Sequence, residues 1–158
     1  MTSSHGMCPH TTRYNLLMIG SPVVLDTNVL VAAAFRPTGN AAWIIQRIRS
    51  GELRMVWHRE TRAETRAVLD KIPPIHWSDF AGLYRREEEW TQPMDLDGLA
   101  CIADPSDRKF AALAKASGAV VISQDDHLLS CRNRLPLDVL RPGELVGLWK
   151  SGDWVHKP

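Results

Sequence analysis

Two short apolar runs constrain the fold more than any other feature of this chain. They are Val23–Leu25 and Ala119–Ser123, both rich in β-branched residues, and the first is followed directly by Asp26. Short continuous runs of this kind are typical of strands buried on both faces of a sheet. Leu53–His58 and Leu137–Leu140 predict two further strands. A sheet built from such strands must be covered on both sides.

Segments whose apolar residues recur at helical spacing separate these strands, and the helices they predict would cover the two faces of the sheet. The clearest predicted helix begins at Asp104, a good N-cap, continues through Pro105 in its first turn and ends at Gly118. Other helices are expected over residues 28–35, 41–50, 59–72 and 142–149. A further helix is predicted to start at the cap Ser78, with Phe80, Leu83, Tyr84 and Glu87 along one side. Strands that alternate with helices indicate an α/β fold with a mainly parallel sheet between two helical layers.

Length and composition bound the class of protein. The chain has 158 residues, of which 44% are hydrophobic, and this fits one domain with a real core. We expect an irregular extension over residues 1–20, a folded domain over 21–149 and a tail over 150–158. Residues 11–20 are too weakly apolar for a signal peptide, and no apolar run approaches the roughly 18 residues of a membrane span.

Charge and cysteine content narrow the class further. The formal net charge is +1, so any basic surface that binds nucleic acid must be local. The three cysteines, Cys8, Cys101 and Cys131, are far apart and show no CxxC spacing. This pattern favours neither a disulfide framework nor a zinc site, and it predicts a cytoplasmic protein.

Four carboxylates occupy informative places on the predicted elements. Asp26 follows the first strand, Asp125 follows the strand at Ala119–Ser123, Asp107 lies in the first turn of the helix before that strand, and Glu64 lies on the helix after residue 58. In open parallel sheets, ligands bind beyond the carboxyl ends of the strands. If these acids converge there, they repel one another unless cations lie between them. Oxygen ligands without His or Cys partners indicate Mg²⁺ or Mn²⁺.

The chain resembles the PIN-domain nucleases, and among them the VapC-like toxins of bacteria and archaea. The resemblance rests on four segments in family order: "VVLDTNVLVAA", "RETRAETRAVL", "DPSDRKFAALAKASGAVVISQDDHLL" and "VLRPGELVGLW". Together they run from Val23 to Trp149. The resemblance implies a compact α/β/α sandwich and a divalent-metal-dependent endoribonuclease that cleaves RNA with a metal-activated water.

The resemblance also assigns residues and partners. The four family acids fall on Asp26, Glu64, Asp107 and Asp125, and site-supporting polar residues fall on Asn28 and Ser123. Many relatives carry another acid two positions after Asp125, whereas this chain has His127 there, preceded by Asp126. The resemblance further implies a cognate antitoxin protein in many cases. A homodimer is left open, and no membrane partner is expected.

Structural roles compete with each of these assignments. Asp26 and Asp125 each stand where an acid can cap a helix, and Asp126 competes with Asp125 for that cap. Asp104 is expected to cap its helix, which leaves Asp107 as the ligand. Glu64 has no basic residue three or four positions away and is expected to face inward with Val68, so it needs a distant partner, which a metal site would supply. Glu60 is its rival for the site.

Three functions remain after these arguments. The first is a metal-dependent endoribonuclease that acts as a toxin. The second is a PIN-like binding module without catalysis, and the third is a phosphohydrolase with an aspartyl nucleophile. That third class usually has a second aspartate two residues after the first, whereas this chain has Asn28. In a nuclease a few arginines could hold phosphates, and the alternative for each one is an ordinary solvated surface position. The clustered candidates are Arg47, Arg49, Arg54, Arg59, Arg62, Arg66, Arg132 and Arg134.

Overall fold

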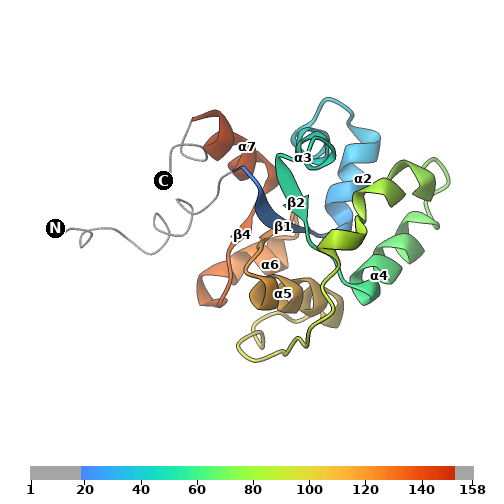
Figure 1. Ribbon diagram of the computed structural model, residues 1–158. Coiled ribbons are helices and arrows are strands. Elements are labelled where there is room, and N and C mark those ends of the chain that lie inside the picture. The colour runs from blue at the N-terminus through green and yellow to red at the C-terminus, as the bar shows by residue number, and fades with distance from the viewer. Residues whose placement is uncertain (1–18, 152–158) are drawn as a thin grey trace.

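A parallel β-sheet forms the centre of the protein. The computed structural model describes residues 19–151, and Figure 1 shows their arrangement. The strands are β1 (Ser21–Leu25), β2 (Leu53–Met55), β3 (Val120–Ile122) and β4 (Val139–Leu140). They pair in the order β2-β1-β3-β4, and every pair is parallel. The predicted parallel sheet is therefore confirmed. Cys8 and most of the predicted extension and tail lie outside the described residues.

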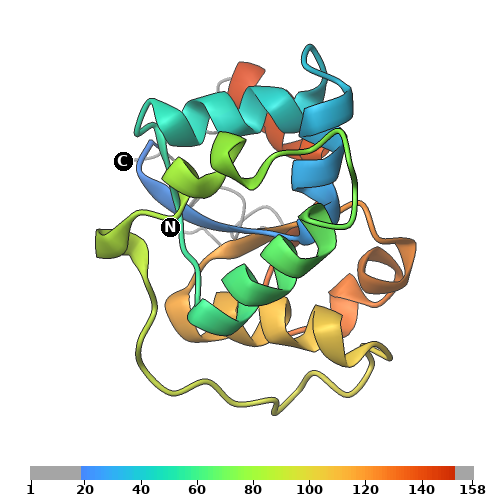
Figure 2. The same ribbon diagram turned by 90° about the vertical axis from the view of Figure 1, so that its right-hand side faces the viewer.

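Two helical layers cover the sheet because its strand residues alternate between faces. Val23 and Leu25 pack with α2 (Thr27–Phe35), α3 (Asn40–Arg49) and α7 (Pro142–Lys150). Val24 and Val121 pack on the other face with α5 (Pro105–Ser117) and α6 (Asp126–Ser130). Figure 2 shows the two layers above and below the sheet. The helix α4 (Arg59–Leu69) packs against both α2 and α5. The expected three-layer α/β/α sandwich is thus observed.

The helix α5 ends as its sequence predicts. The Asp104 carboxylate accepts a hydrogen bond of 2.9 Å from the Ser106 N–H, and Pro105 occupies the first turn. At the other end Gly118 has a φ of 76°, a left-handed conformation that glycine adopts without strain. These two ends place Asp107 in the first turn and bring the chain straight into β3.

The helix expected after Ser78 is absent, and that prediction was wrong. The chain instead forms three short 3₁₀ turns, η1 (Trp77–Asp79), η2 (Ala81–Leu83) and η3 (Arg86–Glu88). Two carbonyls that a helix would use internally bind side chains from elsewhere: Asp79 accepts from Arg49 at 2.7 Å, and Arg85 accepts from the Trp57 indole at 2.7 Å. Tertiary contacts therefore replace the regular helical bonds. Phe80 and Leu83 are nevertheless buried.

The strand order creates a switch point between β1 and β3. From β1 the chain passes to β2 on one side of the sheet, and later it reaches β3 on the other side. Helices leave the two strands toward opposite faces there, and in open parallel sheets such a switch point is where a ligand-binding crevice forms at the carboxyl ends. The Asp26 N–H donates to the Ile122 carbonyl at 3.1 Å, so the two strand ends are in register. No helix within residues 19–151 has the length and apolar character needed to cross a membrane.

Candidate active site

Asp26 lies at the end of β1 and is almost fully buried, with 6% of its surface exposed. It occupies the N-cap position of α2, where its side chain makes no capping hydrogen bond of regular geometry, although the Asn28 N–H still favours its charge. Its Oδ2 instead accepts a 2.8 Å hydrogen bond from the Ser123 hydroxyl. Burial raises the pKa of Asp26 most, and the Asp125 charge adds to this, while the Ser123 hydroxyl and the Asn28 N–H oppose it. A cap alone does not explain this buried carboxylate.

Ser123 connects the carboxylates at the ends of β1 and β3. Its side chain is completely buried, donates to Asp26 and accepts a 3.0 Å hydrogen bond from the Asp125 N–H. Asp125 itself caps α6, because its Oδ1 accepts a 2.9 Å hydrogen bond from the His127 N–H. These bonds fix the backbone and one carboxylate oxygen of Asp125. Asp125 therefore combines a capping role with a place beside Asp26.

Asp107 brings the third carboxylate from α5. Its pKa is raised to about 7, first by burial, then by hydrogen bonding with Asp125 and by the charges of Asp125, Asp26 and Asp104. Like charges in such proximity disfavour ionisation of all members at once. A positive charge nearby would therefore favour the ionised form of Asp107.

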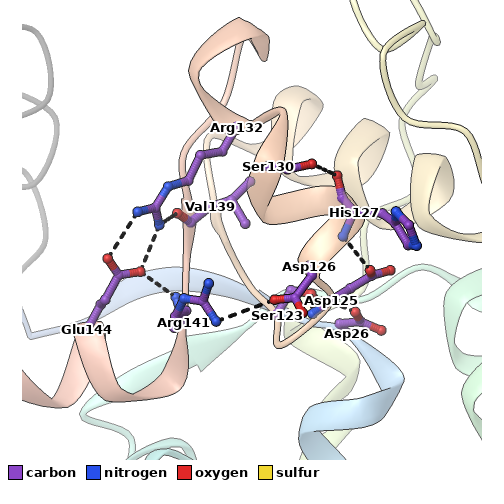
Figure 3. Close-up of polar contacts among 10 residues, drawn as sticks. All are labelled: Asp26, Ser123, Asp125, Asp126, His127, Ser130, Arg132, Val139, Arg141 and Glu144. Atoms are coloured by element: carbon purple, nitrogen blue, oxygen red, sulfur yellow. Dashed lines mark hydrogen bonds and ion pairs between the residues drawn. The ribbon is translucent and has the colours of Figure 1, made fainter.

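Carboxylate oxygens of Asp26, Asp107 and Asp125 all lie within 4.8 Å of one another. Figure 3 shows Asp26 and Asp125 beside each other, with Ser123 next to them and Arg141 farther along the same edge. Among the described residues, no ion pair with Lys or Arg involves any of the three acids. Three converging oxygen donors without a cationic side chain fit a hard divalent ion. Asp26, Asp107 and Asp125 would hold it.

Glu64 is not part of this group of three. Its Oε1 lies 3.2 Å from the Lys109 Nζ, across the contact between α4 and α5. The structure gives Glu64 a lysine as its distant partner, where the sequence argument expected a metal site, and the sequence separation of 45 explains why no local pattern revealed this lysine. One hydrogen bond links the helix of Glu64 to the segment that carries Asp26. Its neighbour Thr65 hydrogen-bonds at 2.8 Å to Thr27, which follows Asp26.

The rest of α4 corrects part of the sequence argument. Val68 was expected to face inward with Glu64, but it is 36% exposed, so that expectation was wrong. The buried stripe is Thr61, Thr65 and Leu69. Both threonines satisfy their hydroxyls, Thr65 with Thr27 and Thr61 with His58, which allows polar side chains to occupy the inner face. Glu60, the rival of Glu64, is exposed.

The remaining predicted residues surround the three acids. Asn28 is exposed in the first turn of α2 and lines an open hollow next to the crevice. Asp126 points away from the group and lies 3.7 Å from the Arg141 guanidinium, with 87% of its side chain exposed. His127 contributes its backbone N–H to the Asp125 cap. Asp125 therefore both caps α6 and belongs to the group of three carboxylates, so these two roles are not split between Asp125 and Asp126.

Comparison with known families identifies the fold. A family model described as the PIN domain matches residues 22–127, which is more than half of the chain. The chain belongs to the PIN-domain family. No curated protein and no solved structure matches it. The PIN-domain match spans all four predicted acids. Membership in this family suggests a metal-dependent nuclease, and the three clustered carboxylates fit a catalytic site of that kind.

Proposed function

We propose that this PIN-domain protein is a divalent-metal-dependent endoribonuclease and the toxin of a toxin–antitoxin pair. The observation that carries the nuclease proposal is the convergence of Asp26, Asp107 and Asp125 within 4.8 Å. The toxin assignment is supported by the resemblance to VapC-like proteins from Val23 to Trp149. The free thiols of Cys101 and Cys131 are compatible with action in the cytoplasm.

The three carboxylates differ in the hydrogen bonds that hold them in place for binding a metal ion. Asp26 is held by Ser123, and Asp125 is held by the His127 N–H, so both present fixed oxygens. Asp107, with a pKa near 7, is the member that loses its proton when a cation binds. A divalent ion held there, Mg²⁺ or Mn²⁺, supplies activation of water and stabilisation of the leaving oxygen. Pre-positioned ligands avoid reorganisation during the reaction.

Glu64 is proposed as the fourth acid of the site. It is anchored through Lys109, and the Thr27–Thr65 bond holds α4 against the start of α2. In this proposal Glu64 orients water or substrate at the edge of the crevice. Asn28 and Ser123 support the site, Asn28 from the open hollow next to the crevice and Ser123 through its bonds to the two strand-end acids. An antitoxin would block the same crevice, with an arginine facing the carboxylates.

RNA cleavage by the purified protein tests this proposal. A panel of structured RNAs should be cut with Mg²⁺ or Mn²⁺ and left intact in excess EDTA. Asp125→Asn should lose cleavage by at least about a hundredfold, because a positioned charged ligand is removed. Activity that persists after chelation would contradict the mechanism. Mn²⁺ binding without any cleavage would favour a PIN-like binding module instead.

Growth of the expressing cells tests the toxin assignment separately. Wild-type protein alone should arrest growth, whereas Asp125→Asn should not. Co-expression of the product of the adjacent small gene should restore growth and inhibit cleavage in vitro. Unimpaired growth with abundant, active protein would indicate a housekeeping RNA-processing enzyme.

A further inference from the structure

An open cavity of about 460 Å³ lies between the end of α2 and the beginnings of α3 and α7, and Gln124, the residue before Asp125, lines it. Arg36, Asn40, Gln124, Arg141 and Gly143 line much of it. A second hollow of about 440 Å³ shares Arg36 and Gln124 with the first and continues to Asn28 and Phe35. We call the two together the arginine groove.

The arginine groove leads directly away from the acidic cluster. Gln124, which lines both hollows, stands between Ser123 and Asp125 in the chain. Asn28, at the near end, follows Asp26 by two residues. Figure 3 shows that Arg141 reaches toward this edge through its contact with Asp126. A polymer that placed one phosphodiester at the acids would therefore continue along the groove.

Charge in the groove favours an anion. No Asp or Glu lines either of its two hollows, while Arg36 and Arg141 do. Within residues 19–151, Arg36 has no ion-pair partner, and Arg141 has only the loose 3.7 Å contact with the exposed Asp126. The first turns of α3 and α7 face the same cavity, and no side chain caps α3, so backbone N–H groups add positive potential. Both arginines line the same cavity, which favours an anion such as a phosphate there.

Most arginines expected from the sequence to hold phosphates have other contacts. Arg54 pairs with Glu88 at 3.1 Å, and Arg132 makes two hydrogen bonds to Glu144. Arg62 lies over the Trp57 ring at 5.5 Å. None of these three lines the groove. Arg36 and Arg141 are therefore better placed, although no sequence pattern singled them out.

Phe35 adds a surface for a base. Its ring is 54% exposed, an unusual position for a large apolar side chain, and it lines the groove next to Arg36. Exposed aromatic rings beside cationic groups are typical of sites that bind single-stranded nucleic acid, because bases stack on the ring while phosphates meet the charges. A duplex would hide its bases from Phe35. The groove therefore fits a single strand better than a double helix.

We propose that the arginine groove binds the single-stranded RNA segment next to the cleaved phosphodiester, with one base on Phe35 and one phosphate between Arg36 and Arg141. This proposal rests on the nuclease function above and deepens it, since it names the residues along which the substrate strand continues from the acids. Phosphate contacts of this kind hold the strand in register at the acids without reading its sequence.

Binding in EDTA tests the groove without relying on cleavage. The probe is a short fluorescein-labelled single-stranded RNA of mixed sequence, and fluorescence anisotropy is measured at several salt concentrations. Arg36→Gln and Arg141→Gln should each weaken binding about threefold to tenfold, and each should lower the magnitude of the salt slope by about 0.7. Phe35→Ala should weaken binding about fivefold or more with the slope unchanged.

Two control variants match these changes away from the groove. Arg86→Gln removes the same charge from the exposed turn η3, and Leu96→Ala removes an exposed apolar side chain of 57% exposure. Both should bind RNA as wild type does. Losses in the controls equal to those in the groove variants would overturn the proposal. Loss of affinity for an oligoglutamate peptide instead of RNA would also overturn it and assign the groove to a protein partner.

Cleavage of the same RNA with Mn²⁺ separates the two proposals. If wild type cuts RNA and the groove variants bind RNA like their controls, the proposal for the arginine groove is wrong and the nuclease function stands. If the groove variants lose binding while wild type never cuts, the groove stands and the nuclease function is wrong. Absence of RNA binding by wild type overturns the groove.

Discussion

At the scale of single residues, Asp104 and Asp107 show how position separates two identical side chains. Asp104 stands before the first turn of α5 and accepts the Ser106 N–H. Asp107 stands three residues later and faces Asp125, which contributes to its raised pKa. The spacing at a helix start predicted the capping role of Asp104, and the structure confirms it. The ligand role of Asp107 stays a prediction.

Asparagine at each position distinguishes the two roles. Asp104→Asn should change the free energy of unfolding by only a few tenths of a kcal/mol, because asparagine caps about as well as aspartate. It should keep most nuclease activity. Asp107→Asn should fold but lose activity by roughly a hundredfold, because it removes a charged ligand. Cleavage rates and melting temperatures at saturating Mn²⁺ provide the check. An inactive Asp104→Asn with an active Asp107→Asn would reverse the assignment.

Glu64 and Lys109 pose a second question at this scale. The proposed role of Glu64 in the site predicts that Glu64→Gln slows cleavage by at least about tenfold. Lys109→Gln breaks the same ion pair but leaves the carboxylate in place, and it should slow cleavage much less. Surface ion pairs typically contribute about 0–1 kcal/mol, so neither variant should unfold the protein. Equal losses of activity would assign Glu64 to the ion pair alone.

At the scale of elements, local patterns predicted the strands and α5 because their signals are local. Strand residues alternate between two buried faces, and the ends of α5 carry a cap, a proline and a glycine. The segment from Trp77 to Glu88 was mispredicted because its carbonyls are taken by Arg49 and Trp57, which are distant in sequence. The Glu64–Lys109 pair escaped notice for the same reason.

Two glycines in different elements give a matched test of this local reasoning. Gly118 has a φ of 76°, so Gly118→Ala should lower the free energy of unfolding by about 1 kcal/mol. Gly147 lies inside α7, and a Cβ there meets nothing within 4 Å. Gly147→Ala should therefore raise the free energy of unfolding by about 0.5–1 kcal/mol. Urea unfolding measures both. Stabilisation by both substitutions would contradict the conformational argument at Gly118.

At the scale of the whole molecule, the order β2-β1-β3-β4 explains why three acids from distant segments meet. Asp26 follows β1 and Asp125 follows β3, and these strands are neighbours at the switch point. The sequence allowed convergence at the carboxyl ends of the strands, but it did not contain the strand order, which depends on long-range pairing. The arginine groove likewise needs the starts of α3 and α7 to meet, and no sequence pattern indicates that meeting.

This convergence predicts how stability depends on pH and metal. The pKa of Asp107 is about 7 in the folded protein, against an ordinary value of 3.8. At a pH between these two values, Asp107 is ionised in the unfolded chain but protonated in the folded protein. Raising the pH therefore destabilises the metal-free fold through this group, and the loss is complete above about pH 7. A bound cation removes the effect because it favours the ionised form.

Melting curves of wild type and Asp107→Asn in EDTA isolate this group from the other carboxylates. The variant should melt close to wild type near pH 4, and its advantage should grow as the pH rises to about 7.5. With saturating Mn²⁺ the order should reverse, because wild type gains the stabilisation of a bound ligand and the variant binds the ion weakly. Asp104→Asn serves as the control and should differ from wild type much less than Asp107→Asn does, because its charge is the smallest of the causes that raise the pKa of Asp107. If the difference in melting temperature between Asp107→Asn and wild type depended on neither pH nor Mn²⁺, the three carboxylates would share neither a proton nor an ion.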